Sequence, residues 1–120
     1  MFPPFILAKL YVKGTLKNTA TGFEFTLKNI IDSTLLIGIG PITVGDKVYE
    51  GAALTMTVPE KSVSGAEISS KNSIPARMGI PIVVSITGAP LPPGQNKIGV
   101  AATTSDIGVI KFEINDTVAE

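Results

Sequence analysis

The chain has 120 residues, of which 44% are hydrophobic and 17% charged, and ten Lys and Arg residues balance ten Asp and Glu residues. The absence of Cys and His excludes thiol nucleophiles, disulfides, imidazole acid–base chemistry and the usual ligands of zinc, copper and haem. No segment clusters Lys or Arg, so nucleic-acid binding is not expected. This size and apolar content predict one domain, residues 1–120, with some apolar surface covered by another chain.

The first seven residues form an apolar segment with two adjacent prolines, Pro3 and Pro4. Because proline fixes φ and lacks an amide donor, we predict an extended arm over residues 1–7. The arm either packs on its own domain or carries Phe2, Phe5 and Leu7 onto a neighbouring subunit. We recognise no secretory signal and no run of about 20 apolar residues, so we expect a cytoplasmic location and no membrane span.

Apolar residues alternate with polar ones in the next two segments, and a period of two predicts strands. Residues 9–18 and 23–28 form a predicted hairpin, with Gly14 as a bulge in its first strand. Residues 34–44 form the third predicted strand. Its glycines, Gly38 and Gly40, leave one face bare, which would allow a second sheet or chain to approach closely.

The middle of the chain predicts shorter elements. Gly45 and Asp46 suit a tight turn into a short strand at residues 47–49, and a further strand follows at residues 54–58. Residues 60–77 are polar and rich in serine. We interpret them as a connection between two sheets, with either a short strand or one helical turn near its middle.

Three strands with clear alternation end the chain, at residues 80–87, 94–103 and 108–114. Leu91, which lies among prolines, is predicted to fill one end of the core, and residues 115–120 are predicted to fray. In total we predict an all-β chain of seven or eight short antiparallel strands. Turn signals about every ten residues are typical of a β-sandwich, and a small β-barrel is the alternative.

The sequence Leu91-Pro-Pro-Gly94 is followed by Lys97-Ile-Gly-Val100, then Ser105-Asp-Ile-Gly108 and Phe112-Glu-Ile114. This order resembles the end of many immunoglobulin-like domains, where a leucine-x-proline-glycine corner precedes the penultimate strand. The resemblance implies an immunoglobulin-like β-sandwich. It departs from the pattern at Ile98, because those domains often place a tyrosine shortly after the glycine.

A second resemblance covers more of the chain. Asn18, the segment Gly22-Phe-Glu-Phe25, the segment Gly45-Asp-Lys-Val-Tyr49 and the corner at residues 91–100 follow one another in an order similar to that of the small β subunits of C-glycoside deglycosidases. Those subunits are β-sandwich partners of a larger barrel subunit, so the resemblance implies a chain that works only in a complex. The aromatic-rich middle of that family is not matched, since this chain has no Trp.

Carboxylates are the only catalytic groups that the sequence offers. Asp106, Glu113 and Asp116 lie along the last predicted strand, where Glu113 should face solvent, and we interpret all three as surface acids. The serines, Ser64 among them, have no histidine to act as a base. We therefore expect no catalytic residue, no cofactor and no metal site.

These observations favour a non-catalytic β-sandwich that acts as a structural or protein-interaction module, either as a homo-oligomer or with a partner protein. Its candidate contact residues are of types that anchor interfaces, namely Phe2, Phe5, Leu7, Tyr11, Tyr49 and Arg77. The alternative is an accessory, non-catalytic subunit of a larger enzyme. A small-molecule or carbohydrate binder is less favoured because only 6% of the residues are aromatic.

Overall fold

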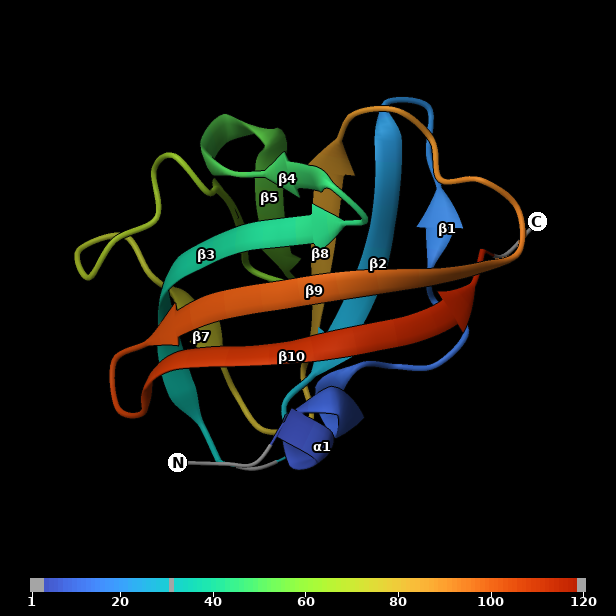
Figure 1. The fold of residues 1–120 in the computed structure, drawn as a ribbon. Helices are drawn as coiled ribbons and strands as arrows, with labels where there is room; N and C mark the ends of the chain where they lie inside the picture. Colours follow the sequence, from blue (N-terminus) through green and yellow to red (C-terminus); the bar gives the residue numbers. More distant parts are fainter. Residues whose placement is uncertain (1–3, 31, 119–120) are drawn as a thin grey trace.

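The computed structural model describes residues 4–30 and 32–118, and these residues form two antiparallel sheets packed face to face (Figure 1). The first sheet has the strand order β1-β2-β8-β5-β6, and the second has the order β10-β9-β3-β4 with β7 also paired to β3. The strands are β1 (Lys17–Asn18), β2 (Gly22–Lys28), β3 (Thr34–Val44), β4 (Lys47–Tyr49), β5 (Leu54–Val58), β6 (Lys61–Ser64), β7 (Ile74–Ala76), β8 (Pro81–Thr87), β9 (Gln95–Thr104) and β10 (Gly108–Thr117).

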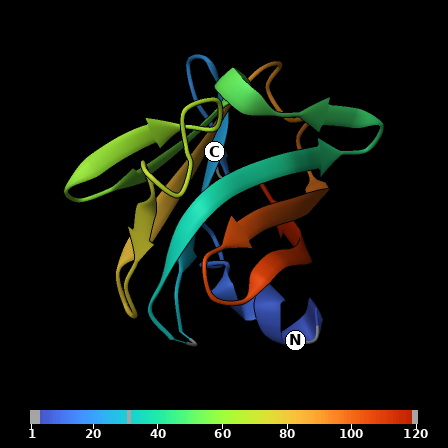
Figure 2. The same ribbon diagram turned by 90° about the vertical axis from the view of Figure 1, so that its left-hand side faces the viewer.

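The β-sandwich prediction is confirmed, and the described part of the chain shows two separate sheets in place of one closed barrel. The strands β3, β9 and β10 run across the strands β2, β5 and β8 (Figure 1). In Figure 2 the yellow-green strands β5 and β6 lie on the opposite side of the molecule from the red strand β10.

The core forms from the alternating residues of both sheets. In the first sheet Phe23 pairs with Ile86 and Phe25 with Val84, and all four side chains are buried. In the second sheet, Val100 of β9 pairs with Phe112 of β10 in the same way. Burial of each such side chain contributes about 1.5–3 kcal/mol, so the period of two in the sequence sets the inward faces.

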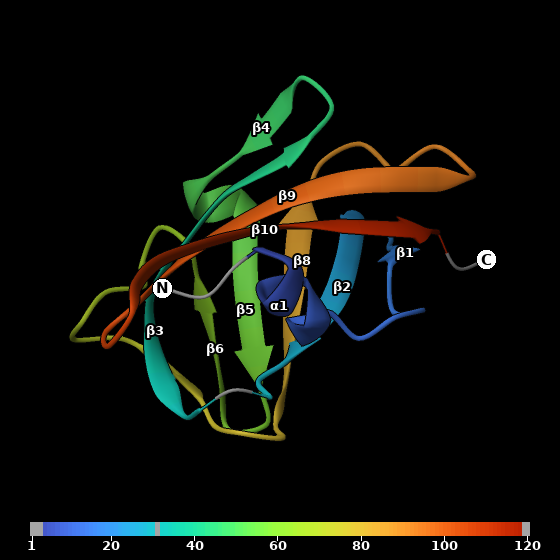
Figure 3. The same ribbon diagram turned by 60° about the horizontal axis from the view of Figure 1, so that its bottom comes forward.

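The prediction of an extended N-terminal arm is wrong for the residues that are described. Pro4–Leu7 form one helical turn, α1, which continues as the 3-10 turn η1 (Ala8–Leu10). Proline is tolerated in the first turn of a helix because the amide that it lacks has no partner there. Leu7 and Leu10 are buried in the core of this same chain, and α1 packs beside β10 (Figures 1 and 3).

The first predicted strand is shorter than expected, since only Lys17–Asn18 pair regularly with β2. The chain before them follows β2 irregularly, with an isolated bridge from Tyr11 to Leu27. Gly14 interrupts this stretch at a φ of 88°, a backbone conformation that favours glycine. The predicted bulge is thus a break that ends regular pairing.

The polar connection at residues 60–77 crosses between the sheets as predicted, but it holds two strands. β6 pairs with β5 in the first sheet, and β7 pairs with β3 in the second. The predicted fraying is wrong for residues 115–117, because β10 continues to Thr117 and pairs there with Gln95, whereas residues 119–120 lie outside the described residues.

At Gly40, the face of β3 that was predicted to be bare is covered by the other sheet of the same chain. A Cβ atom on Gly40 would lie 2.9 Å from Cδ1 of Leu54, which belongs to the opposite sheet. A Cβ atom on Gly38 would lie 3.2 Å from the side chain of Thr103 on the neighbouring strand. The glycines therefore allow close packing within the sandwich.

Candidate functional site

The residues predicted to contact a partner lie in different parts of the molecule. Leu7 is buried in the core, and Tyr49 packs edge-on against Phe23 with 5.7 Å between the ring centroids. Arg77 is exposed and forms an ion pair with Glu60. Phe2 lies outside the described residues, as does the side chain of Phe5. The candidates whose side chains are described are therefore not gathered into one surface, and the role of all six as partner contacts stays a prediction.

Tyr11, the remaining candidate, joins the N-terminal segment to the last strand. Its hydroxyl donates to Oδ2 of Asp116 at 2.7 Å and accepts from the amide of Leu16 at 3.1 Å. The amide of Gly14 donates to the same carboxylate oxygen at 2.8 Å. We call this group the Tyr11–Asp116 clasp.

The clasp shifts the pKa of both of its titratable groups. The Tyr11 hydroxyl and the Gly14 amide donate to the Asp116 carboxylate and hold its pKa below the ordinary value of 3.8. Burial, together with the hydrogen bond to Asp116, raises the pKa of Tyr11 above 10.0. Both shifts favour a neutral phenol bonded to an ionised carboxylate, which is a structural arrangement.

The three carboxylates along the end of the chain do not converge. Asp106 lies in the turn before β10, Asp116 lies near the other end of that strand, and Glu113 forms an ion pair with Lys97 at 3.6 Å. Ser64 donates to a carboxylate oxygen of Glu67 at 3.2 Å on the exposed surface. In residues 4–30 and 32–118 no three acidic side chains are grouped as a metal would require.

A shallow groove of about 610 Å³ lies on the outer face of β3, β9 and β10. Small residues such as Gly99 and Ala101 line the groove, together with Lys111 and Glu113. Phe112 is the one aromatic residue among those that line it, and this ring is buried toward the core. The groove therefore offers no exposed aromatic face on which a sugar ring could stack.

Several exposed apolar side chains lie on segments of the chain that adjoin one another. Among the side chains that are described, six large hydrophobic ones are exposed, and five of them, 39% to 55% exposed, lie on adjoining segments. The amide of Ser105 donates to the carbonyl of Leu35, which places the β9–β10 turn beside the start of β3. The amide of Gly79 donates to the carbonyl of Asn29, which joins the loops before β3 and β8. We call the five residues the apolar corner: Ile30, Leu35, Met78, Ile107 and Val109.

The apolar corner was missed in the sequence because its residues are far apart in the chain and break no strand pattern. A partial signal exists, since Met78 and Ile107 stand in turns, where polar residues are usual.

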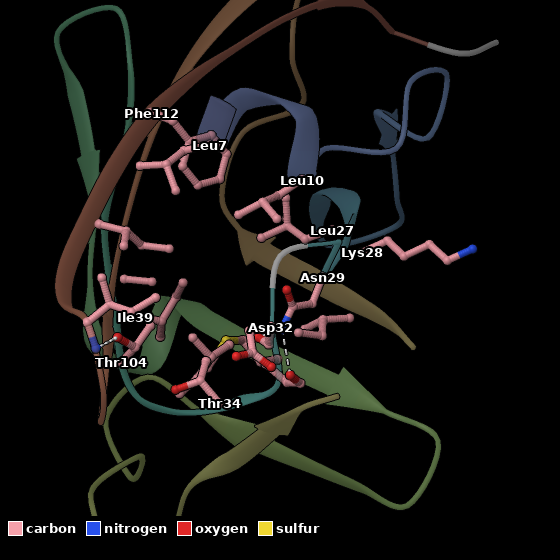
Figure 4. Close-up of a pocket in the computed structure, with 17 residues that line it drawn as sticks. Leu7, Leu10, Leu27, Lys28, Asn29, Asp32, Thr34, Ile39, Thr104 and Phe112 are labelled. Carbon is pink, nitrogen blue, oxygen red and sulfur yellow. Dashed lines mark hydrogen bonds between the residues drawn. The ribbon is translucent and has the colours of Figure 1, made fainter. Parts of the chain in front are cut away.

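A small cavity opens between the sheets next to this corner (Figure 4). Its volume is about 60 Å³, and side chains from both sheets and from α1 and η1 line it. Leu7 and Leu10 close one side, and Ile107 of the apolar corner reaches its lining. We call this space the inter-sheet cavity.

Few polar groups face the inter-sheet cavity. The hydroxyl of Thr104 donates to the carbonyl of Gly108 and accepts from the amide of Ile107. The side-chain amide of Asn29 donates to the carbonyls of Asp32 and Ala76. Thr34 differs, because its hydroxyl oxygen is buried and forms no hydrogen bond with the described residues.

Comparison with known proteins gives one family. Residues 6–119 match the family described as hydroxymethylglutaryl-CoA reductase, N-terminal domain, whereas the comparison with curated proteins found no match. This family differs from both resemblances drawn from the sequence. No helix in the described ranges is long and apolar enough to cross a membrane. The match extends over nearly the whole chain, and the protein therefore belongs to the family of the hydroxymethylglutaryl-CoA reductase N-terminal domain.

Proposed function

We propose that this chain is a non-catalytic protein-interaction module that self-associates through the apolar corner. The observation that carries the proposal is that five exposed apolar residues lie on adjoining segments, namely Ile30, Leu35, Met78, Ile107 and Val109. Single exposed hydrophobic residues are ordinary on protein surfaces, but a contiguous group of them marks a contact surface. The lack of His and Cys in the sequence supports a role without catalysis.

Sedimentation equilibrium tests self-association over a range from micromolar to hundreds of micromolar. We expect a mass above the 12.5 kDa of one chain that rises with concentration. The paired change Leu35→Thr and Val109→Thr keeps β-branched residues in both strands while removing apolar area, so it should return the chain to a monomer. Val48→Thr is the matched control, because Val48 is 59% exposed and lies outside the apolar corner. A wild-type monomer at every concentration would refute the proposal.

A second candidate function is that of an accessory domain beside the catalytic part of an enzyme, and the family match favours it. In this case the apolar corner would dock on the enzyme. Gel filtration of the chain with a separately produced catalytic domain of hydroxymethylglutaryl-CoA reductase should then give a complex. The Leu35→Thr and Val109→Thr pair should weaken this complex, and separate elution of the two wild-type proteins would argue against the docking.

We also propose that the sandwich is a single, immunoglobulin-like domain. The strand orders β1-β2-β8-β5 and β10-β9-β3 correspond in chain order to the two sheets of constant immunoglobulin domains, with β4, β6 and β7 as additional strands. The way in which the front strands run across the back strands departs from the aligned packing of those domains, so strand order is the support. A cytoplasmic location stays a prediction from the sequence.

A further inference from the structure

The inter-sheet cavity is lined by apolar side chains from three parts of the fold. Met56 and Ile82 come from the first sheet, and Leu36 and Phe112 come from the second. Side chains of α1 and η1 close one side (Figure 4). An apolar space of this kind favours a hydrocarbon group over water.

Two small side chains leave this space open between the sheets. Ala76 of β7 and Ala102 of β9 line the cavity, and both are buried. Each contributes one methyl group at a position that faces the core, where the inner side chains of two packed sheets normally interdigitate. The larger side chains around the space therefore lack part of the dispersion contacts that a filled core would give them.

The neutral polar groups of the lining are either hydrogen-bonded or out of reach. The Thr104 hydroxyl forms two hydrogen bonds at the β9–β10 turn, and the side-chain amide of Asn29 donates to two backbone carbonyls. The hydroxyl oxygen of Thr34 is so deeply buried that a molecule in the cavity does not touch it. Buried water needs about two to four polar partners, so these walls do not suit water.

The two charged residues of the lining lie on its solvent side. Lys28 and Asp32 are both exposed. The ammonium group of Lys28 is directed away from the other lining residues (Figure 4), and the Asp32 carboxylate accepts a hydrogen bond from the amide of Ser33 at 2.8 Å. Ile107, which also lines the cavity, is exposed as well. These exposed residues mark the side from which a small molecule would enter.

The volume of about 60 Å³ sets the size of the ligand. One water-sized group needs roughly 10–15 Å³ of such space, so the cavity holds about four to six heavy atoms. An engineered apolar cavity of about 150 Å³ takes up benzene, and the smaller space here suits a short alkyl group.

We propose that the inter-sheet cavity binds a hydrocarbon group of about four to six heavy atoms, held without a hydrogen bond to the protein. Two effects favour its binding, namely the transfer of the hydrocarbon out of water and new dispersion contacts with the lining side chains. The site does not depend on self-association through the apolar corner.

The probe for the test is n-butane, titrated as a dissolved gas into the whole chain while methyl NMR signals are recorded. We expect saturable shifts at Leu36, Met56 and Ile82. 1-Propanol has the same size as n-butane, but its hydroxyl would leave water without finding a partner in the cavity, so it should bind at least about tenfold more weakly.

A longer alkane separates the cavity from the exposed apolar surface. n-Octane is about twice as long as the cavity allows, so it should bind more weakly than n-butane. Binding to an exposed surface would show the opposite order, because the buried apolar area rises with chain length.

Two variants that fill the cavity complete the test. Ala102→Leu adds three carbons to a lining residue and should abolish the saturable shifts. Ala76→Val adds two carbons and should weaken binding at least about tenfold, so it serves if the first variant fails to fold. Ala66→Leu is the matched control, because Ala66 is exposed and lies outside the lining, and it should leave binding unchanged.

Four outcomes would each overturn the proposal. They are the absence of saturable shifts in the wild type, equal affinity for 1-propanol, tighter binding of n-octane, and binding that survives in the folded filled variants. Shifts that centre on Leu35 and Val109 would do the same, since they would place the hydrocarbon on the apolar corner.

Discussion

Removal of the Tyr11 hydroxyl should destabilise the fold by about 2 kcal/mol. A hydrogen bond to a charged acceptor contributes about 1.5–3 kcal/mol. The bond to Asp116 is 2.7 Å long but only partly buried, so the lower end of this range applies. Tyr11→Phe also leaves the amide of Leu16 without its 3.1 Å acceptor, which adds a few tenths of a kcal/mol. The packing of the ring against Phe25, at 6.4 Å between centroids, is kept.

Urea unfolding monitored by circular dichroism measures this effect. With a denaturant slope of about 2 kcal/mol per molar urea, the midpoint should fall by about 1 M. Tyr49→Phe is the matched control, because the Tyr49 hydroxyl forms no hydrogen bond with the described residues and the ring contact with Phe23 would persist. A double-mutant cycle with Asp116→Ala should give a coupling energy of about 1 kcal/mol or more. Equal midpoints for Tyr11→Phe and Tyr49→Phe, or a coupling energy of zero, would refute the reasoning.

The clasp also predicts how stability depends on pH. The pKa of Asp116 is lower in the folded state, so its contribution is complete above the ordinary value of 3.8 and is lost as the pH falls through the folded value. The pKa of Tyr11 is higher in the folded state, so its contribution is complete below 10.0 and is lost as the pH rises through the folded value. The stability difference between the wild type and Tyr11→Phe should therefore be flat between about pH 4 and 10 and shrink on both sides.

Two further substitutions test the packing of loops and strands, both measured by urea unfolding. Asn18→Ala should lower the free energy of unfolding by about 2 kcal/mol. The Asn18 side chain accepts a hydrogen bond from the amide of Leu91 at 2.8 Å and donates one to the carbonyl of Leu91 at 3.1 Å. An unchanged urea midpoint would show that the loop around Leu91 does not depend on these two hydrogen bonds. Gly22→Ala should cost about 3 kcal/mol or more, because its Cβ atom would lie 1.9 Å from the carbonyl oxygen of Ile86. Gly14→Ala is the comparison, since no atom of the described residues beyond its chain neighbours lies within 4 Å of the added Cβ atom. Only the strain of a φ of 88°, about 1–2 kcal/mol, is expected there. Equal losses of stability in the two glycine variants would contradict the clash at Gly22.

The strands with one buried face could be predicted from the sequence. β2 and β8 alternate between the core and the surface, and their predicted inward residues, such as Phe25 and Val84, pair across the ladder. The burial of Leu91 was also predictable, because an apolar residue in a proline-rich turn usually packs against the end of the core. The local sequence pattern was sufficient to predict a strand and its inward residues wherever one face of the strand meets the core.

The elements that depend on tertiary contacts could not be predicted. α1 is only four residues long, too short to be stable alone, and the burial of Leu7 holds it in place. β6 is short and mostly polar, and β7 has only three residues, Ile74–Ala76, so their pairing is set by the neighbouring strands and not by their own sequence. β10 extends past Ile114 because β9 is there to pair with it.

The candidate site was the least predictable part for the same reason. Tyr11 and Asp116 are 105 positions apart, and nothing in either segment indicates the other. Thr34 was part of a predicted strand, but the burial of its hydroxyl without a hydrogen-bond partner among the described residues depends on the tertiary packing around it. Sequence alternation places a side chain on a face, whereas the space in front of it depends on the whole fold.

The distance along the chain between Tyr11 and Asp116 has a consequence for biosynthesis. The segment that holds α1 leaves the ribosome about a hundred residues before its docking partner β10. Until then Leu7 and Leu10 have no complete surface on which to bury themselves. Closure of so long a loop is slow and entropically costly, so attachment of the first turn should be among the last events of folding. A chaperone that binds apolar nascent segments would find its target in the segment around Leu7 and Leu10.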